Sequence, residues 1–540
     1  MIAGIALLAA IAGIGLCILF LDAADLNARA PVRPEPTPSA QEDAAQDKPA
    51  LAQRADYLPD GVYYGKRLPV TEFRTKDGGV RDLNEDRGKK RVLLFWGSWC
   101  PYCDRVLQHA GEFERVLEEY ASYELILIDK LDTGKGESIE KAEAFLVQSG
   151  IRFECLYDAG LRAYDAYGLK LIPTVLVLDE DGYLRAMTVE PLESGEALRA
   201  LLSDAESGGA AATERFVREN MIGEDGGVYT TYADQNGDPP TGKDVLSESQ
   251  GLVMEYALLT DDRQWFDQSY RYAKEKLRRD GVFCWYVTRD GKQADANALI
   301  DDLRIYRALR LADERWGGYA AEARALAKAI EGHNVTRGHL AGFYDFKQKR
   351  AGKTLPLFSL DLQALRMLAE DAQGFAALAD EAEAILSGGY IGDAFALYYS
   401  SYDVGTKRYS QDSLNTSEAL ITLLHAVRAG VAKQESLDWL AERVARGTLA
   451  ARYDVDGQPV QGFNYDSTAA YAIAALIGAE AGDARLYTNA RNRMEKYHVT
   501  AQSALCGSFS DRADGSDIIA FDQLLPLLVY GGTGDIMFED

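Results

Sequence analysis

Two cysteines separated by two residues are the first chemically suggestive feature of this sequence. Cys100 and Cys103 stand in "WGSWCPYC", directly after the apolar run "RVLLFWG" and at the expected start of a helix. The helix dipole and the exposed amides at such a start stabilise a thiolate on the first cysteine, which makes it a nucleophile. Pro173 in "LIPT" follows about 70 residues later and is a candidate substrate-contacting cis-proline beside the cysteines.

A carboxylate at the start of an apolar helical run is the second such feature. Glu248 lies in "DVLSESQGLVMEY", between two serines and shortly before a glycine. The helix dipole and capping both favour a carboxylate at a helix start, so Glu248 could be a purely structural charge. It could also be the acid of an active site. The surrounding sequence has to distinguish the structural role from the catalytic one.

The segment around the cysteines alternates strand-like and helix-like patterns. Between residues 57 and 205 the apolar runs "RVLLFWG", "ELILID", "RFECLYD" and "TVLVLD" are separated by helical patterns at residues 104–120 and from residue 139 onward. This alternation predicts an α/β domain. The cysteine pair follows the first strong strand of that domain.

Residues 57–205 resemble a thioredoxin-like domain of the membrane-tethered, extracytoplasmic disulfide-reductase type. The segments "WCPYC" at residues 99–103 and "IPT" at residues 172–174 both stand where that family has them. The resemblance implies that Cys100 attacks a disulfide of a partner protein and that Cys103 resolves the mixed disulfide. The alternatives are a structural disulfide and half of a zinc site, although a zinc site would need a second ligand pair nearby. Cys155, on a predicted strand, is expected to be a buried thiol.

From about residue 213 to the end, paired helical patterns replace the strands. Helices are expected at residues 248–259, 265–277, 300–315, 320–330, 360–369, 375–386, 416–427, 435–446, 466–477, 484–497 and 518–530, with a weaker one around 393–401. Roughly twelve helices in about 325 residues are what stacked helical hairpins would give, so we predict an (α/α)6 toroid over residues 213–540. Such a ring collects loops at one end of its inner helices into a cleft, so chemistry is expected at inner-helix starts.

The stretch around Glu248 resembles glycoside hydrolase family 8, the inverting endoglucanase, chitosanase and xylanase family. The family pattern Ser-Glu-Gly-x-Gly-Tyr-Gly-Met aligns with residues 247–254, which puts Glu248 at the position of the general acid. The later signature Ala-Ser/Thr-Asp-Ala/Gly-Asp, with its downstream Trp, aligns without gaps with residues 298–316. The segment "FNYDSTAAY" resembles the family's Tyr-Asp-Ala-x-Arg segment, which puts Asp466 at the position of the general base of the cellulase-like subgroup.

Two positions depart from the family pattern. The first Asp of the later signature falls on Ile300 and the second on Asp302, with Asp301 between them, and the Arg of the other segment falls on Ala469. A one-residue local shift would return a carboxylate to the cleft, which keeps both Asp301 and Asp302 as candidate catalytic residues. As structural alternatives, this pair could be a solvated acidic pair at a helix start, and Asp466 could be only a helix N-cap.

Inverting hydrolysis needs two carboxyl groups in different protonation states. A protonated carboxyl donates to the leaving oxygen, and an opposed carboxylate about 6.5–9.5 Å away activates a water. Glu248 and Asp466 could supply this pair, and a partly desolvated site beside another carboxylate would help the acid to hold its proton. Aromatic rings could form sugar platforms, although singly they are more often core residues. The candidates are Trp265, Trp285, Tyr286, Tyr229 and Tyr232.

The first residues of the chain bear on its location. Residues 2–21 form an uninterrupted apolar run of about the length that spans a bilayer as a helix. No Lys or Arg precedes the run and no clear small-residue cleavage site follows it, which favours an uncleaved signal anchor over residues 1–22. A lipoprotein interpretation would use Cys17, but the bulky Leu16 stands where such sites want a small residue. Residues 23–56 are rich in Pro, Ala, Gln and charge and are expected to form a disordered tether.

Charge and cysteine usage narrow the partners further. A formal net charge of −26 would repel a phosphate backbone, so no nucleic-acid partner is expected. Cys284 and Cys506 could form a disulfide in an oxidising compartment or remain two separate buried thiols. We expect no metal and no cofactor.

These features predict a multidomain protein of the cell membrane: an N-terminal transmembrane helix, an α/β thioredoxin-like domain and an all-α (α/α)6 toroid, both globular domains lying outside. The expected activity is inverting, internal cleavage of a β-linked exopolysaccharide, a substrate class that comes from the family resemblance alone. The alternative is a toroid that binds glycan without chemistry, which Ile300 and Ala469 favour and which leaves the thioredoxin-like domain as the only active unit. A third interpretation makes disulfide reduction the main task. The expected partners are a polysaccharide, a protein dithiol or disulfide, and the membrane.

Overall fold

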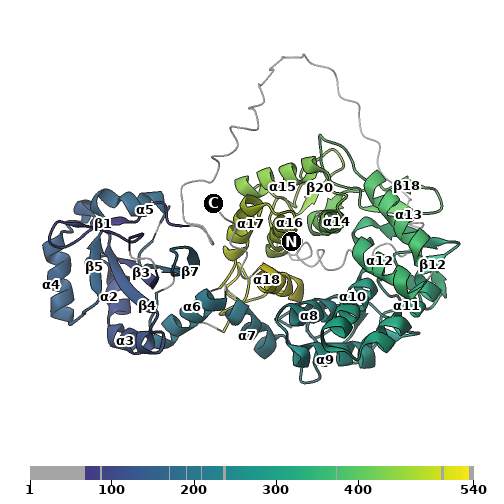
Figure 1. Cartoon of the computed structure of the whole chain (residues 1–540), viewed down its shortest axis with the longest axis horizontal. Coiled ribbons are helices and arrows are strands. Elements are labelled where there is room, and N and C mark those ends of the chain that lie inside the picture. The colour runs from purple at the N-terminus through teal and green to yellow at the C-terminus, as the bar shows by residue number, and fades with distance from the viewer. Residues whose placement is uncertain are drawn as a thin grey trace, which may run out of the picture. The chain divides into compact units, whose positions relative to one another are not determined.

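The structure is a computed structural model that describes residues 67–533 except 86–87, 170, 190, 208–209, 235–238, 373 and 500–503. The predicted anchor at residues 1–22 and the predicted tether at residues 23–56 lie outside the described residues. Across the described residues, no helix is both long and apolar enough to cross a bilayer. A mixed α/β part comes first and a mainly helical part with short strand pairs follows, which is the predicted order of domains (Figure 1).

The α/β part is built on one seven-stranded sheet. Its strands are β1 (Glu72–Arg74), β2 (Val80–Asp82), β3 (Lys90–Trp96), β4 (Tyr123–Asp129), β5 (Glu154–Tyr157), β6 (Thr174–Leu178) and β7 (Leu184–Thr188). They lie in the order β2-β1-β5-β4-β3-β6-β7, in which β3, β4 and β5 are parallel and the other neighbours are antiparallel. The strand that leads into the cysteine pair, β3, is therefore an interior strand.

Alternate residues of β3 enter two separate cores. The helices of this part are α2 (Pro101–Leu107), α3 (Ala110–Glu119), α4 (Ile139–Ser149), α5 (Arg162–Ala166) and α6 (Gly195–Ser207). Val92, Leu94 and Trp96 pack with residues of α2, α3, α4 and α6, whereas Leu93 and Phe95 pack with residues of α5. Because both faces of the strand are covered, its sequence is a continuous apolar run and does not alternate.

The helical part is a double ring of helices (Figure 1). In the described part of the chain, the inner ring consists of α8 (Ser247–Leu259), α10 (Leu299–Trp316), α12 (Leu362–Asp371), α14 (Thr416–Arg428), α16 (Thr468–Glu480) and α18 (Ala520–Thr533). The outer ring consists of α7 (Ala210–Asn220), α9 (Arg263–Tyr272), α11 (Ala320–Asn334), α13 (Phe375–Gly388), α15 (Gln434–Arg446) and α17 (Ala484–Glu495). Consecutive inner helices contact one another, and α18 contacts α8 and so closes the ring. The predicted (α/α)6 toroid is confirmed.

The toroid differs from the expected helix pattern at two places. Residues 393–401 form turns and an isolated bridge between Tyr390 and Tyr398. This segment is rich in tyrosine, which is more common in extended structure than in helices. The outer helix that precedes α8 is α7, which the helical pattern had not indicated.

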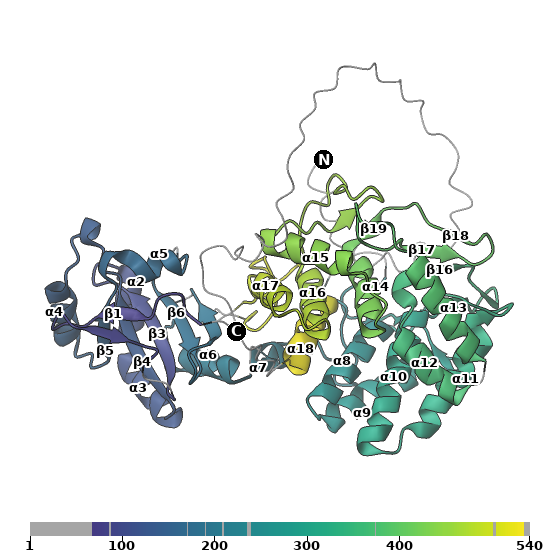
Figure 2. The same cartoon turned by 45° about the horizontal axis from the view of Figure 1, so that its top comes forward.

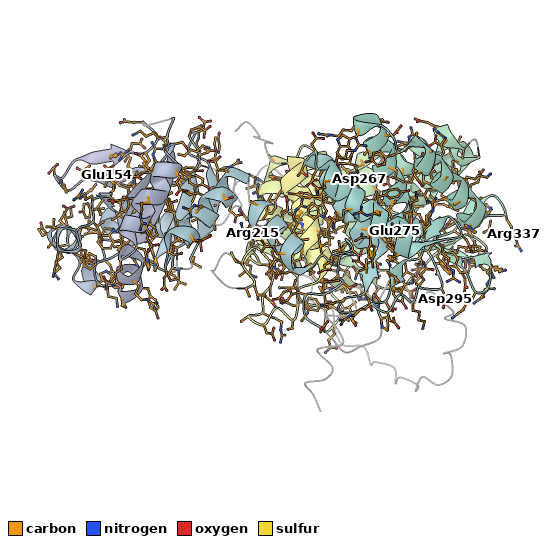
Figure 3. All side chains as sticks on the ribbon, turned by 90° about the horizontal axis from the view of Figure 1, so that it is seen from below. Glu154, Arg215, Asp267, Glu275, Asp295 and Arg337 are labelled. Atoms are coloured by element: carbon orange, nitrogen blue, oxygen red, sulfur yellow. The ribbon has the colours of Figure 1, made fainter. Side chains whose placement is uncertain are left out.

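The inner helix α16 is buried on all sides, whereas outer helices carry charge on their exposed side. In α16 every residue from Thr468 to Gly478 is buried, as expected of a helix that is apolar all round. A Cβ on Gly478 would lie 2.5 Å from the backbone nitrogen of Tyr487, so glycine allows α16 and α17 to approach closely. Figure 2 shows α16 between α14 and α18, which it contacts on either side. Asp267 of α9 and Glu275 are exposed examples of the charged side chains in Figure 3.

Candidate active site

The starts of five inner helices, α8, α10, α14, α16 and α18, meet at one mouth of the toroid. Residues from the last turns of α8, α14 and α16 line a common cavity, so the first turns of these parallel helices lie at the opposite end. We call the end with the first turns the N-terminal mouth and the other end the C-terminal mouth. The five helices that start at the N-terminal mouth each carry a carboxylate at or just before the first turn: Glu248, Asp301, Glu418, Asp466 and Asp522. The sixth inner helix, α12, begins deeper in the ring, at its N-cap Asp361.

Two short strand pairs fix where two of these helices begin. β8 (Val245–Leu246) pairs with β11 (Tyr286–Val287) and runs directly into α8. In the same way β19 (Leu414–Asn415) pairs with β20 (Arg452–Tyr453) and runs directly into α14. The ladders hold the first turns of α8 and α14, and hence the backbones of Glu248 and Glu418, in place.

Glu248 is the second residue of α8 and keeps partial access to solvent. Its side chain is 26 % exposed, and its Oε1 lies 4.0 Å from Nη1 of Arg304. Burial and the negative charges of Asp301 and Glu418 raise the pKa of Glu248 to about 7, although Arg304 opposes them. A carboxyl that still holds a proton near neutral pH can act as a general acid.

Asp301 stands beside Glu248 and is held from two sides. Ser247 Oγ donates a 2.6 Å hydrogen bond to its Oδ2, and Arg304 Nη1 lies 3.3 Å from its Oδ1. Burial raises the pKa of Asp301, while Arg304 and Ser247 act in the opposite direction. A Cβ on Gly251 would lie 2.9 Å from Cδ of Arg304, so this glycine of α8 makes room for the arginine. The sequence shift at Ile300 therefore leaves Asp301 as the carboxylate next to Glu248.

Asp302 does not share that place. It is fully buried, and its two oxygens accept hydrogen bonds of 2.9 Å from the Phe283 backbone nitrogen and 2.6 Å from Asn297 Nδ2. Burial raises its pKa well above the ordinary value. Asp302 ties α10 to the segments before it, while Ile300 lines a narrow space in the toroid interior.

Glu418 is a carboxylate at this mouth that sequence reasoning missed. It is the third residue of α14, and its backbone nitrogen donates to Asn415 Oδ1 at 3.2 Å. Burial raises the pKa of Glu418 to about 7, opposed by Arg452. Its charge in turn raises the pKa of Glu248, so the two groups are neighbours across the ring. In the sequence, "NTSEAL" is an ordinary capping pattern, and only the ring closure brings it to the site.

Asp466 has the opposite electrostatic character. Its Oδ1 and Oδ2 accept hydrogen bonds from the hydroxyls of Tyr497, at 2.5 Å, and Tyr471, at 2.8 Å. Burial disfavours its charge, but these hydroxyls and Lys496 outweigh burial and hold the pKa of Asp466 below its usual value. Asp466 is therefore ionised at neutral pH, which is the state that a general base requires.

Ala469, where the family has Arg, lies in the first turn of α16. Its side chain is buried, and its backbone nitrogen donates a 2.9 Å hydrogen bond to Oδ1 of Asp522. Burial raises the pKa of Asp522 to about 6. The first turn of α16 is thus held by a carboxylate from α18, and the position offers no cation to a substrate.

The candidate sugar platforms divide into two groups. Trp265 is 2 % exposed on the outer helix α9, where it packs edge-on against Tyr256 and under the Arg218 guanidinium, so its assignment as a platform is wrong. The other four rings are partly exposed and lie on the segments that precede α8 or α10: Trp285, Tyr286, Tyr229 and Tyr232. The carbonyl of Trp285 accepts from the backbone nitrogen of Ser247, which places this residue beside the first turn of α8. Sequence reasoning missed Tyr465, which is 43 % exposed and directly precedes Asp466.

The cysteine pair has the geometry expected of a thioredoxin-like site. Cys100 caps α2, and the backbone nitrogen of Cys103 donates to its Sγ at 3.4 Å. The peptide bond between Ile172 and Pro173 is cis, and the Ile172 carbonyl lies 3.6 Å from the Cys100 Sγ. Burial and the neighbouring Cys100 raise the pKa of Cys103. The more accessible thiol, Cys100, is thus also the one at the helix N-terminus.

A buried carboxyl behind the cysteines also escaped sequence reasoning. Asp129 ends β4 and is fully buried, and within the described structure neither of its oxygens has a hydrogen-bond partner. Burial, with a contribution from Glu137, raises the pKa of Asp129 to about 8. Its charge also raises the pKa of Cys103, so this carboxyl lies within electrostatic range of the cysteine pair.

Three further cysteines lie in the part of the chain that the structure describes. Cys155 is buried on β5, and no disulfide joins Cys284 to Cys506. In the described ranges, no group of three or more His, Cys, Asp or Glu side chains is arranged to hold a metal ion.

Two family profiles match successive parts of the chain. The family described as Redoxin matches residues 63–202, and the family described as Glycosyl hydrolases family 8 matches residues 194–357. The second range includes Glu248 and Asp301 and ends before Glu418 and Asp466.

Relatives divide along the same line. "Putative lipoprotein YdaJ" of Bacillus subtilis (strain 168) is 26% identical over 325 residues, which cover 58% of this chain and 84% of that protein. "Thiol-disulfide oxidoreductase ResA" of Halalkalibacterium halodurans is 29% identical over 106 residues, or 20% of this chain and 57% of that protein. A solved structure described as a novel alpha-amylase from Clostridium perfringens is 27% identical with a TM-score of 0.56, and the match covers 60% of this chain and 97% of that one. The chain is therefore a fusion of a thioredoxin-like redoxin domain with a glycosyl hydrolase family 8 domain, an enzyme of the glycosidase class.

Proposed function

We propose that the toroid cleaves an extracellular polysaccharide internally, with inversion, and that Glu248 is its general acid. The observation that carries this proposal is the contrast at the N-terminal mouth, where Glu248 holds a proton to about pH 7 while Asp466 is held ionised. These are the two protonation states that inverting hydrolysis requires. A sugar chain would lie between Glu248, in the first turn of α8, and Asp466, just before α16.

The reaction follows from these charges. Glu248 gives its proton to the oxygen of the leaving sugar as the glycosidic bond breaks, and Asp466 takes a proton from the water that attacks the opposite face of the ring. Once Glu248 is ionised, the negative charge of Asp301 repels it and the guanidinium of Arg304 attracts it. The repulsion keeps Glu248 protonated before reaction, and the guanidinium limits the cost of its charge afterwards.

The thioredoxin-like domain exchanges disulfides with a partner protein in this proposal. The Cys100 thiolate attacks one sulfur of the partner's disulfide and releases the other as a thiolate. Cys103, once deprotonated, attacks the mixed disulfide, so that the partner leaves as a dithiol and Cys100–Cys103 becomes the disulfide. Insulin reduction in the presence of a dithiol reductant should be lost in Cys100→Ser and kept in the control Cys506→Ser. Equal rates in both variants would contradict the redox role.

We place both domains outside the cell membrane, held there by residues 2–21. The support is the apolar run itself together with the names of ResA, a thiol-disulfide oxidoreductase, and YdaJ, a lipoprotein. Protease added to intact cells should remove both domains from the membrane fraction. Protection of both domains until the cells are lysed would contradict this location.

The linkage of the substrate has two candidates. The family resemblance favours a β-linked exopolysaccharide, whereas the similarity to a structure described as an alpha-amylase favours an α-linked glucan. The loss of the family Asp at Ile300 and Arg at Ala469 supports a third outcome, a toroid that binds glycan without cleaving it.

One assay separates these outcomes. Reducing-end release is measured from β-linked polysaccharides, starch and the producing organism's own exopolysaccharide, with Glu248→Gln and the exposed-site control Glu370→Gln. Release that disappears only in Glu248→Gln supports the proposal. The polysaccharide that is cleaved identifies the linkage. NMR of the anomer that forms first tests inversion. If the parent and both variants bind glycan but release no reducing ends, the toroid is a glycan-binding domain without hydrolase activity.

A further inference from the structure

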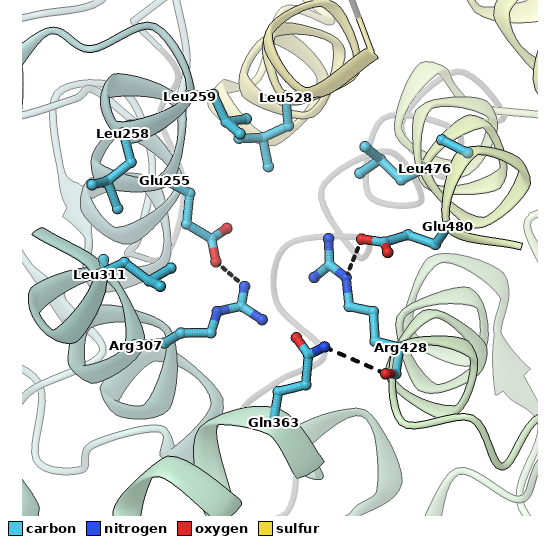
Figure 4. A pocket seen from close by; sticks show the side chains of 12 residues that line it. Glu255, Leu258, Leu259, Arg307, Leu311, Gln363, Arg428, Leu476, Glu480 and Leu528 are labelled. Carbon is cyan, nitrogen blue, oxygen red and sulfur yellow. Dashed lines mark hydrogen bonds and ion pairs between the residues drawn. The ribbon is translucent and has the colours of Figure 1, made fainter. Parts of the chain in front are cut away.

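The cavity at the C-terminal mouth of the toroid lies at the opposite end from Glu248. Its volume is about 380 Å³, and every inner helix contributes to its wall (Figure 4). One side is apolar and is formed by Leu258, Leu259, Leu311, Leu476 and Leu528. Leu259 and Leu311 are 46% and 41% exposed, so this apolar side continues to the rim. Cavities of this size commonly bind small molecules.

Two arginines face each other across the polar side. Figure 4 shows the guanidinium groups of Arg307 and Arg428 directed toward the centre of the cavity, each beside a glutamate. The guanidinium of Arg307 already forms two ion pairs, one with Glu255 and one, at 3.0 Å, with Asp361. Arg428 keeps donors for a ligand. Its Nε donates a 2.8 Å hydrogen bond to Glu480, and its Nη groups have no hydrogen-bond partner among the described residues.

A narrower space of about 40 Å³ shares part of this lining and reaches His425 in the toroid interior. His425 is 5 % exposed, and neither ring nitrogen has a hydrogen-bond partner in the described structure. Its Nδ1 lies 4.0 Å from Asp361, too far for a hydrogen bond. Buried polar groups without partners are rare in folded proteins. A group that accepts hydrogen bonds would satisfy both His425 and the free edge of Arg428.

We propose that this cavity binds a small amphipathic carboxylate, such as a medium-chain fatty acid, with its head at Arg428 and its chain against the leucines. The two Nη groups of an arginine match the two oxygens of a carboxylate. The described lining contains no aromatic side chain, which argues against a sugar as the occupant. The net charge of the chain does not prevent binding, since charges beyond about 8 Å are screened at physiological ionic strength.

Calorimetric titration of the full chain with octanoate and octanol, both below micelle formation, tests this site. We expect saturable binding of one octanoate per chain, with octanol at least tenfold weaker because it lacks the anionic head. Arg428→Gln should lose octanoate binding, and the exposed-site control Arg446→Gln should keep it. Absence of saturable octanoate binding, or equal affinity for octanol, would overturn the proposal.

A second variant protects the test against misfolding of Arg428→Gln. Leu259→Trp fills the rim of the cavity from a position that is exposed, so the fold should tolerate it. We expect this variant to bind octanoate at least tenfold more weakly than the parent, with an unchanged Tm in the absence of ligand. Unchanged octanoate affinity in Leu259→Trp would place the binding elsewhere and refute the assignment.

Discussion

Glu248 and Glu255 lie about two turns apart on α8, yet their pKa values move in opposite directions. Burial and Asp301 raise the pKa of Glu248 to about 7. Burial also acts on Glu255, but the guanidiniums of Arg307 and Arg304 outweigh it and lower the pKa of Glu255. The placement of arginines, and not burial alone, therefore decides which carboxyl keeps a proton.

The same rule holds elsewhere in the ring. Arg307 and His425 outweigh the burial of Asp361 and lower its pKa to about 2. Glu418 faces only the weaker influence of Arg452, and its pKa rises to about 7. Carboxyls that can donate a proton thus gather at the N-terminal mouth, and carboxylates paired with arginine brace the middle of the toroid.

The largest expected effect is on catalysis. Glu248→Gln keeps the shape of the side chain but cannot donate a proton, so reducing-end release should fall about 10²–10⁴-fold, the usual contribution of a general acid. Glycan binding should persist, which a binding assay on the same variant checks. A variant that retains most of its activity would remove Glu248 from the acid role.

Glu255→Gln should act on stability. The substitution leaves the buried Arg307 and Arg304 with one carboxylate fewer, a change that typically costs about 3–5 kcal/mol. Calorimetry should show a clear fall in the Tm of the toroid, with no such fall in the exposed-site control Glu370→Gln. If Glu255→Gln has the same Tm as Glu370→Gln, the ion pairs of Glu255 do not stabilise the ring.

The comparison also predicts a pH dependence of stability. Glu248 titrates near 7 in the folded chain and near 4.3 when unfolded, so the folded state binds more protons and loses stability as pH rises through this window. Removing the group should therefore raise the Tm of Glu248→Gln relative to the parent more at pH 8 than at pH 5. A Tm difference that is constant with pH would mean that Glu248 has an ordinary pKa.

The smallest expected effect comes from Asp301→Asn. The amide can still accept the hydrogen bond from Ser247, but it removes the negative charge that raises the pKa of Glu248. The alkaline limb of the pH–rate profile should move to lower pH, while Ser247→Ala should move it less. A shift to higher pH would contradict the assigned role of Asp301.

Much of the fold could be predicted because its signals are local. The cysteine spacing and the Ile172-Pro173 segment indicate the thioredoxin-like site, and paired helical patterns indicate the toroid. Trp265 was misassigned because an aromatic residue near a motif looks the same whether it faces a cleft or, as here, the core of an outer helix.

Which residues meet at the site depends on contacts between segments far apart in the sequence, and no local pattern reveals such contacts. Glu418 is about 170 residues from Glu248 in the sequence and reaches it only because the ring closes. Asp301 and Asp302 are adjacent, yet one helical step of about 100° turns the first toward Glu248 and the second into hydrogen bonds with Phe283 and Asn297. The exact start of α10, which the sequence did not define, decides between them.

The central claim is that Glu248 donates the proton, and the pH dependence of kcat/KM on the most active polysaccharide tests it most directly. The account predicts a bell-shaped profile whose alkaline limb falls near pH 7, as Glu248 loses its proton, and whose acid limb lies below the ordinary range of a carboxyl, where Asp466 becomes protonated. A profile that stays flat from pH 6 to pH 9 would contradict it.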